Sequence, residues 1–220
     1  MDLAFVVFLE EALGGSKPGL EAQLKMSTEP RPGTRAPAAV DDSCSKAGVL
    51  LLLYPRNGQL HLVLTCRTEQ VESHQGQISL PGGRQEPGES LEETALRETR
   101  EELGIHLDSI RVLGELTSLY IPRSNYCITP VVAFSSEPPV FQPFHVEVAE
   151  VIEVPLAHLM DEKNIRKELW TFRGREMMVP FYAFRNHKIW GATAMVLAEF
   201  MVIAEKALQI ETRDKKSVHS

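Results

Sequence analysis

One segment constrains the fold more than any other, the helix predicted over residues 91–103 in the stretch LEETALRETREEL. Ser90, followed three residues later by Glu93, forms a capping box at its start, and Gly104 stands where a left-handed residue commonly ends a helix. The apolar positions of this helix gather into one stripe, which must face a core. The stripe consists of Ala95, Leu96, Thr99 and Leu103. The chain therefore needs a layer on which this helix can pack.

The same helix carries three glutamates in one arc of its surface. Glu98, Glu101 and Glu102 stand at spacings i, i+3 and i+4, so their side chains point in similar directions. A like-charge pair four residues apart costs roughly 0.2–0.5 kcal/mol, which a bound divalent cation more than reverses. The residues alone leave two interpretations, a solvated charged face or a metal site.

The segments around this helix predict an α/β protein. The apolar runs at 47–55 and 60–67 are separated by Asn57-Gly58, a strong signal for an antiparallel hairpin. Residues 76–83 predict a short strand that ends in a glycine turn. Further strands are predicted at 110–121, 127–135 and 147–155, the last running into a short helix, followed by a hairpin over 169–184 that turns at Arg173-Gly174 and a long amphipathic helix from 190 to 208.

The composition of the chain divides it into three parts. Residues 1–46 predict an N-terminal extension: an amphipathic helix or a poorly ordered terminus first, then a proline-rich linker over 28–46. The apolar stretch near the start is too short to span a bilayer and lacks the basic region of a signal peptide. Residues 47–210 form the main domain, and residues 211–220 form a polar tail that we expect to be frayed.

Charge and cysteine content limit the partners and the compartment. A formal net charge of −7 argues against a nucleic acid or an anionic membrane as partner, whereas a phosphorylated small molecule remains compatible if arginines or a metal ion offset the repulsion. Cys44, Cys66 and Cys127 are odd in number and widely spaced, which predicts neither a disulfide framework nor a thiolate zinc site. We expect a cytoplasmic protein, and a homodimer is an open alternative to a monomer.

The spacing of residues 83–105, GRQEPGESLEETALRETREELGI, resembles the Nudix box of the Nudix hydrolases at every fixed position, with Thr99 as a soft departure where the family prefers an aliphatic residue. The resemblance implies an α/β/α sandwich with a mixed central sheet and metal-dependent hydrolysis of a nucleoside diphosphate derivative. It implies Mg²⁺ or Mn²⁺ as the cofactor. The implied metal ligands are Gly83, through its carbonyl, Glu98, Glu101 and Glu102, of which Glu101 and Glu102 are also candidate catalytic residues. Arg97 is implied to orient the glutamates with Glu89 as a partner, and a local i,i+4 pair with Glu93 is the alternative.

The flank of the box, residues 63–83, resembles the motif that precedes it in coenzyme A pyrophosphatases. The matching residues are Leu64, Thr65, Arg67, Gly76, Pro81, Gly82 and Gly83, and Glu72 departs because the pattern has a basic residue there. The resemblance extends over residues 47–205 and implies coenzyme A, or an acyl-coenzyme A, as the substrate, cleaved to 3′,5′-ADP and 4′-phosphopantetheine. An ADP-ribose or NADH pyrophosphatase is the enzymatic alternative, and a nucleotide-binding regulatory domain without activity is the alternative from another class.

Several residues outside the box are candidates with a plain structural alternative. Arg67 is a candidate phosphate contact, or a strand-end arginine paired with a carboxylate. Glu147 is our choice of general base among Glu147, Glu150 and Glu153, any of which can instead be a solvent-facing strand residue. The structural reading is favoured for Arg123 and His74. Phe141 and Phe144 are candidates for the wall of an adenine or pantetheine site, or for core residues.

Overall fold

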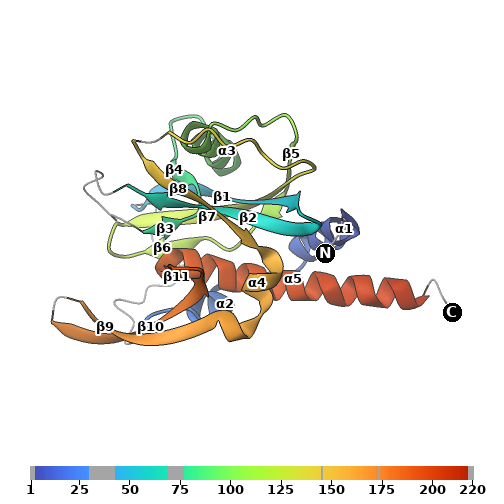
Figure 1. Ribbon diagram of the computed structural model, residues 1–220. Helices are drawn as coiled ribbons and strands as arrows, with labels where there is room; N and C mark the ends of the chain where they lie inside the picture. The colour runs from blue at the N-terminus through green and yellow to red at the C-terminus, as the bar shows by residue number, and fades with distance from the viewer. Residues whose placement is uncertain (1–2, 30–42, 69–76, 145, 173, 218–220) are drawn as a thin grey trace.

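The computed structural model describes residues 3–29, 43–68, 77–144, 146–172 and 174–217. A central sheet of eight strands lies between two layers of helices, with α3 (Leu91–Leu103) on one face and α1 (Leu3–Gly14) and α5 (Gly191–Ser217) on the other (Figure 1). This arrangement confirms the predicted α/β/α sandwich.

The central sheet is mixed, as predicted. Its main path runs in the order β3-β2-β1-β7-β5, while β4 pairs with β1, β6 with β7 and β8 with β2. Strands β1 and β7 run parallel, and the other pairs are antiparallel. The strands are β1 (Ser45–Arg56), β2 (Gln59–Arg67), β3 (Ile78–Ser79), β4 (Gly82–Arg84), β5 (Ile110–Glu115), β6 (Leu119–Ile121), β7 (Tyr126–Ser135) and β8 (Val148–Pro155).

The apolar run of β1 is continuous because helices cover the sheet on both faces. Successive residues point to opposite faces, so Leu50 and Leu52 join the cluster under α3, while Leu51 and Leu53 join the larger cluster with α1 and α5. All four side chains are fully buried. Two cores, one on each side of the sheet, therefore hold the sandwich together.

Both predicted hairpins are confirmed. Asn57 and Gly58 have φ values of 51° and 74°, the two left-handed residues that suit a tight turn between β1 and β2. Strands β9 (Ile165–Phe172) and β10 (Arg175–Phe184) form the second hairpin, whose turn residue Arg173 lies outside the described residues. With β11 (His187–Trp190), which was not predicted, they form a separate three-stranded sheet. It follows α4 (Leu156–Met160) and the short 3₁₀ turn η2 (Glu162–Asn164).

The N-terminal helix packs as part of the larger core. Phe5, Leu9 and Leu13 of α1 are buried in the cluster that also contains residues of α5. The predicted amphipathic helix is therefore confirmed. Residues 30–42, most of the predicted linker, lie outside the described residues, and the domain boundary near residue 46 stays a prediction.

A buried carboxylate joins the N-terminal segment to the rest of the fold. Glu199 of α5 is fully buried and accepts hydrogen bonds from the backbone of Gly19, at the start of α2 (Gly19–Leu24), and from the Gln23 side chain. It also accepts from the backbone and hydroxyl of Thr117. One side chain thus connects α5, α2 and the β5–β6 connection.

The structure corrects the expectation about cysteines. Cys44 and Cys127 form a disulfide, with Sγ atoms 2.10 Å apart, while Cys66 is free. The parallel pairing of β1 with β7 places Lys46 opposite Cys127, so the beginnings of two strands that are distant in sequence lie together. Because 83 residues separate the two cysteines, no local spacing pattern could reveal the pair.

The C-terminal helix is longer than expected. Helix α5 continues to Ser217, past residue 211, where we expected fraying. No helix in the described parts of the chain is both long and apolar enough to cross a membrane.

Candidate active site

The glutamate-bearing helix begins and ends as predicted. The Ser90 hydroxyl accepts from the backbone N–H of Glu93 (3.1 Å), and the Glu93 carboxylate accepts from the backbone N–H of Ser90 (2.7 Å). Gly104 ends α3 in the left-handed region, with φ of 62°. Thr99 is fully buried, and its hydroxyl donates to the carbonyl of Ala95 within the helix. These features fix the direction in which the helix presents its carboxylates.

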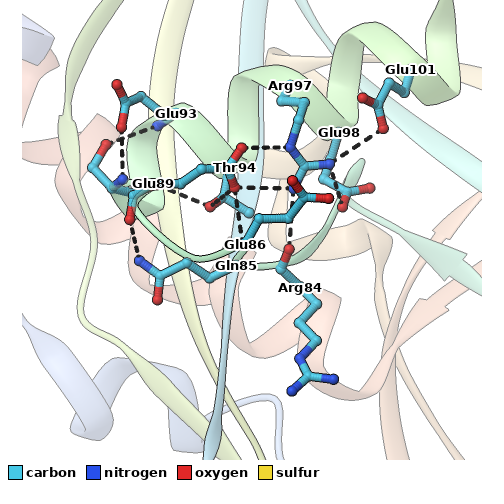
Figure 2. A network of polar contacts seen from close by, with 10 residues as sticks. Arg84, Gln85, Glu86, Glu89, Glu93, Thr94, Arg97, Glu98 and Glu101 are labelled. Atoms are coloured by element: carbon cyan, nitrogen blue, oxygen red, sulfur yellow. Dashed lines mark hydrogen bonds and ion pairs between the residues drawn. The ribbon is translucent and has the colours of Figure 1, made fainter.

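Arg97 is the centre of an ion-pair network (Figure 2). Its Nε and Nη2 donate to the two oxygens of Glu89 at 2.6 and 3.1 Å, and Nη1 lies 2.9 Å from Glu98 Oε1 and 3.3 Å from Glu101 Oε2. Nη2 also donates to the carbonyl of Arg84. The partnership with Glu89 is thus confirmed, while the alternative partner Glu93 is engaged in the capping box.

Glu89 connects the network to the loop before α3. Its carboxylate accepts from the Thr94 hydroxyl (3.0 Å) and from the backbone N–H of Glu86 (3.1 Å) as well as from Arg97. The hydrogen bond from Arg97 is the main cause that lowers the pKa of Glu89 to about 2. Sequence reasoning missed the role of Thr94, which stands in the first turn of the helix and carries no charge to suggest it.

Gly83 lies directly against the carboxylate of Glu98. A Cβ atom at position 83 would lie 2.4 Å from Glu98 Cδ, closer than real Cβ contacts come. Glycine at this position therefore allows the Glu98 carboxylate to lie where it does, because any side chain would displace it. The close approach brings together the backbone of Gly83 and the first of the three glutamates.

Glu102 is the buried member of the glutamate arc, with 8% of its surface exposed. Its Oε2 accepts from the backbone N–H of Gly82 at 3.3 Å. The pKa of this carboxyl is raised to about 7, chiefly by burial and to a smaller extent by the charges of Glu98 and Glu147, while the charge of Arg67 and the hydrogen bond from Gly82 oppose the rise. Charged side chains from α3, β2 and the end of the β7–β8 connection thus act on Glu102.

The donor set suits a divalent cation. Carboxylates on a rigid helix, beside a glycine backbone that approaches them closely, are the oxygen ligands that Mg²⁺ and Mn²⁺ prefer. Within the described residues, no three such side chains converge on one point as they stand, since Arg97 engages both Glu98 and Glu101. An ion bound here would compete with Arg97 for the carboxylates of Glu98 and Glu101.

Three glutamates near β8 have different surroundings. Glu150 is exposed and lies 3.2 Å from His187, whereas Glu153 accepts from the Tyr54 hydroxyl (2.8 Å) and pairs with Arg56. Glu147 is also exposed, and its charge acts on Glu102. Of the three, Glu147 is the one coupled to the glutamate arc.

The other candidate residues outside the box also differ from one another in their surroundings. Phe141 packs edge-on against Tyr54, with ring centroids 5.9 Å apart, so it belongs to the core under α3. Phe144 is 54% exposed. Arg123 is exposed in the β6–β7 turn, and both Glu72 and His74 lie outside the described residues.

An open depression of about 610 Å³ lies beside the network. It is lined by residues 84–89 of the β4–α3 loop and by Glu98. Of the glutamate arc, Glu98 lines this depression and is open there to a molecule from solvent.

Comparison with known proteins identifies relatives. The family model for the NUDIX domain matches residues 45–175. Mitochondrial coenzyme A diphosphatase NUDT8 of Homo sapiens is 34% identical over 171 residues, covering 76% of this chain and 69% of its own. Peroxisomal coenzyme A diphosphatase NUDT7 of Mus musculus is 30% identical over 173 residues (75% and 73%), and Nudix hydrolase 3 of Caenorhabditis elegans is 30% identical over 190 (78% and 79%). A solved Nudix hydrolase from M. smegmatis, RenU, aligns with a TM-score of 0.48 at 20% identity, covering 76% of this chain and 87% of its own.

Proposed function

The chain belongs to the Nudix hydrolase family, and from this premise we propose that it cleaves the diphosphate of coenzyme A or an acyl-coenzyme A to 3′,5′-ADP and 4′-phosphopantetheine. The observation that carries the proposal is the position of two α3 carboxylates, Glu98 and Glu102, directly against the Gly82–Gly83 backbone of β4. The names of two relatives, both coenzyme A diphosphatases, support the choice of substrate.

Nudix hydrolases generally use divalent metal ions, and we propose Mg²⁺ or Mn²⁺ here. The Gly83 carbonyl and the carboxylates of Glu98, Glu101 and Glu102 would hold the ion. When bound, such an ion neutralises charge on phosphoryl oxygens and lowers the pKa of a water molecule. Arg97 holds Glu98 and Glu101 in place until the ion competes for them.

Two further residues complete the proposal. Glu147 is proposed as the general base, because it is exposed while its charge acts on Glu102. Arg67 is proposed to bind a phosphate oxygen, since a guanidinium at this position supplies a positive charge beside the carboxylates.

The test is product analysis with the full chain. Coenzyme A, ADP-ribose and NADH are each incubated with Mg²⁺, Mn²⁺ or a chelator, and the phosphorus-containing products are identified. Metal-dependent release of 3′,5′-ADP, with the highest kcat/KM for coenzyme A, is the expected result. A preference for ADP-ribose or NADH would replace the substrate assignment, and binding without hydrolysis would favour a regulatory domain.

Variants distinguish the loss of metal ligands from a general loss of structure. Glu98→Gln and Glu102→Gln are expected to abolish metal-dependent hydrolysis. Glu92→Gln, an exposed glutamate in the first turn of the same helix, is the matched control and is expected to retain it. Full activity in Glu102→Gln would remove that residue from the proposed ligands.

The compartment and assembly are part of the proposal. The cytoplasmic location expected from the sequence stays a prediction, and two relatives are named as a mitochondrial (NUDT8) and a peroxisomal (NUDT7) coenzyme A diphosphatase. Imaging of a tagged full chain distinguishes these locations, and light scattering distinguishes a monomer from a homodimer.

A further inference from the structure

We infer that an apolar strap beside the glutamate arc, residues 140–144 and 146–147, binds the neutral arm of the substrate, and that Phe144 sets the preference for it. The inference rests on the proposed function and deepens it, because it names the residue that distinguishes one diphosphate from another. The strap belongs to the connection between β7 and β8, which passes along α3 (Figure 1).

The first anchor of the strap is the end of α3. The backbone N–H of Gln142 donates to the carbonyl of Leu103 (2.8 Å), and that of Phe144 donates to the carbonyl of Glu102 (3.0 Å). The Gln142 carbonyl lies so close to Gly104 that a Cβ there would come within 2.3 Å of it. Phe144 is therefore fixed one hydrogen bond away from the backbone of a proposed metal ligand.

The second anchor is the end of β2. The Thr68 hydroxyl donates to the carbonyl of Val146 (2.8 Å), and the Thr68 backbone N–H donates to the carbonyl of Glu147 (3.1 Å). Because Arg67 precedes Thr68, the strap bridges two elements that carry site residues. Backbone hydrogen bonds from Glu147 and Val148 to the carbonyl of Phe144 close a turn between them. The same turn thus carries both Phe144 and the proposed base.

The strap leaves apolar side chains in solvent although its backbone is well bonded. Val140, Phe144 and Val146 are 70%, 54% and 56% exposed, and they make up half of the six large exposed apolar residues among the described residues. Single exposed apolar residues are ordinary, but a group beside a reaction site indicates a surface that a ligand covers. Phe141, by contrast, is already packed on Tyr54.

Charge identifies the part of the substrate that fits. The connection from residue 136 to 147, SEPPVFQPFHVE, contains two glutamates and no lysine or arginine. A phosphorylated nucleoside lying on this connection would be repelled by the two carboxylates and would find no lysine or arginine of the connection to pair with. An uncharged pantetheine arm or its acyl ester is not repelled, and it can bury apolar surface against valine and phenylalanine. We therefore assign the strap to the arm and not to the nucleoside.

The experiment measures kcat and KM separately for Phe144→Ala on decanoyl-coenzyme A, coenzyme A and ADP-ribose. KM for decanoyl-coenzyme A is expected to rise roughly tenfold, the scale of losing one apolar contact, with a smaller rise for coenzyme A. KM for ADP-ribose and all kcat values are expected to stay unchanged. Phe144→Leu should restore most of the affinity, and Leu169→Ala, an equally exposed residue on β9, should behave as wild type.

The outcomes distinguish a failure of the inference about the strap from a failure of the proposed function. Wild-type protein that cleaves coenzyme A but shows unchanged KM values in Phe144→Ala overturns the inference alone. An equal rise for ADP-ribose also overturns it, since the contact would then be with the nucleoside. If the wild type cleaves none of the three, calorimetric binding of decanoyl-coenzyme A to wild type and Phe144→Ala decides, and equal affinities overturn the inference.

Discussion

The absence of a side chain at Gly83 determines where the Glu98 carboxylate can lie. The Glu98 carboxylate occupies the space that a Cβ at position 83 would need, so this carboxylate can lie against the strand backbone only because the residue is glycine. The sequence pattern indicated the glycine and the glutamate together. Their direct contact depends on how β4 packs against α3, which only the structure shows.

Gly83→Ala is accordingly expected to weaken Mn²⁺ binding roughly 10- to 100-fold, the range typical of disturbing the support of a metal ligand. The reason is that Glu98 must move away from the new methyl group. Calorimetric titration with Mn²⁺ measures the change. Gly14→Ala, at a position with nothing within 4 Å of the added Cβ, is the control, and equal Mn²⁺ affinity in both variants would contradict the prediction.

Glu89 makes the stability of the site dependent on pH. Its folded-state pKa of about 2 lies below the unfolded value of about 4.3, so its contribution is fully present above the unfolded pKa and is lost as the pH falls through about 2. The difference in unfolding free energy between wild type and Glu89→Gln is therefore expected to be full at pH 6 and to shrink between pH 4.5 and 2. Denaturant titrations over this range measure it. A difference that stays constant with pH would show that the ionised form of Glu89 is not responsible.

At the scale of elements, the sequence predicted a helix or hairpin well where the signals for both of its ends, or for its turn, were present. The capping box and Gly104 gave α3 its bounds, and Asn57-Gly58 gave the first hairpin. The elements that were missed, among them α2 and β11, are short and carry neither a capping pattern nor a long apolar repeat. The disulfide was missed for another reason, because it depends on the parallel pairing of β1 with β7.

The N-cap of α3 offers a direct test of the element that carries the glutamates. Ser90→Ala removes the acceptor for the Glu93 backbone N–H and is expected to cost about 1 kcal/mol of unfolding free energy. Ser90→Gly is expected to cost only a few tenths of a kcal/mol, because glycine is tolerated at an N-cap. Urea denaturation of the two variants measures the difference. Equal losses would mean that the hydroxyl contributes little.

At the scale of the whole molecule, Glu199 joins three segments that are far apart in sequence. Its carboxylate accepts hydrogen bonds from the Gly19 backbone, the Gln23 side-chain amide, and the backbone and hydroxyl of Thr117. Sequence reasoning could not single it out, because a glutamate in a long helix is ordinary and its burial depends on α2 covering it. The site candidates were easier, since the box holds most of them in 23 consecutive residues.

Glu199→Gln turns one of these accepting oxygens into a donor that faces other donors. We expect a loss of about 1–3 kcal/mol in unfolding free energy, the cost of an unsatisfied buried polar group. Limited proteolysis should also show faster cleavage near residues 15–18, where α1 leads into α2. Glu205→Gln, an exposed change on the same helix, is the control and should leave both measurements as in wild type.

The contact between the first and the last helix has a consequence for synthesis on the ribosome. The core under α3 is built from residues that all precede α4, so it can close while the chain is still being made. The opposite core needs α1 together with α5, about 180 residues later. Burial of Phe5, Leu9 and Leu13 is therefore completed only at the end of translation, and until then part of the apolar face of α1 is open to contact with other chains.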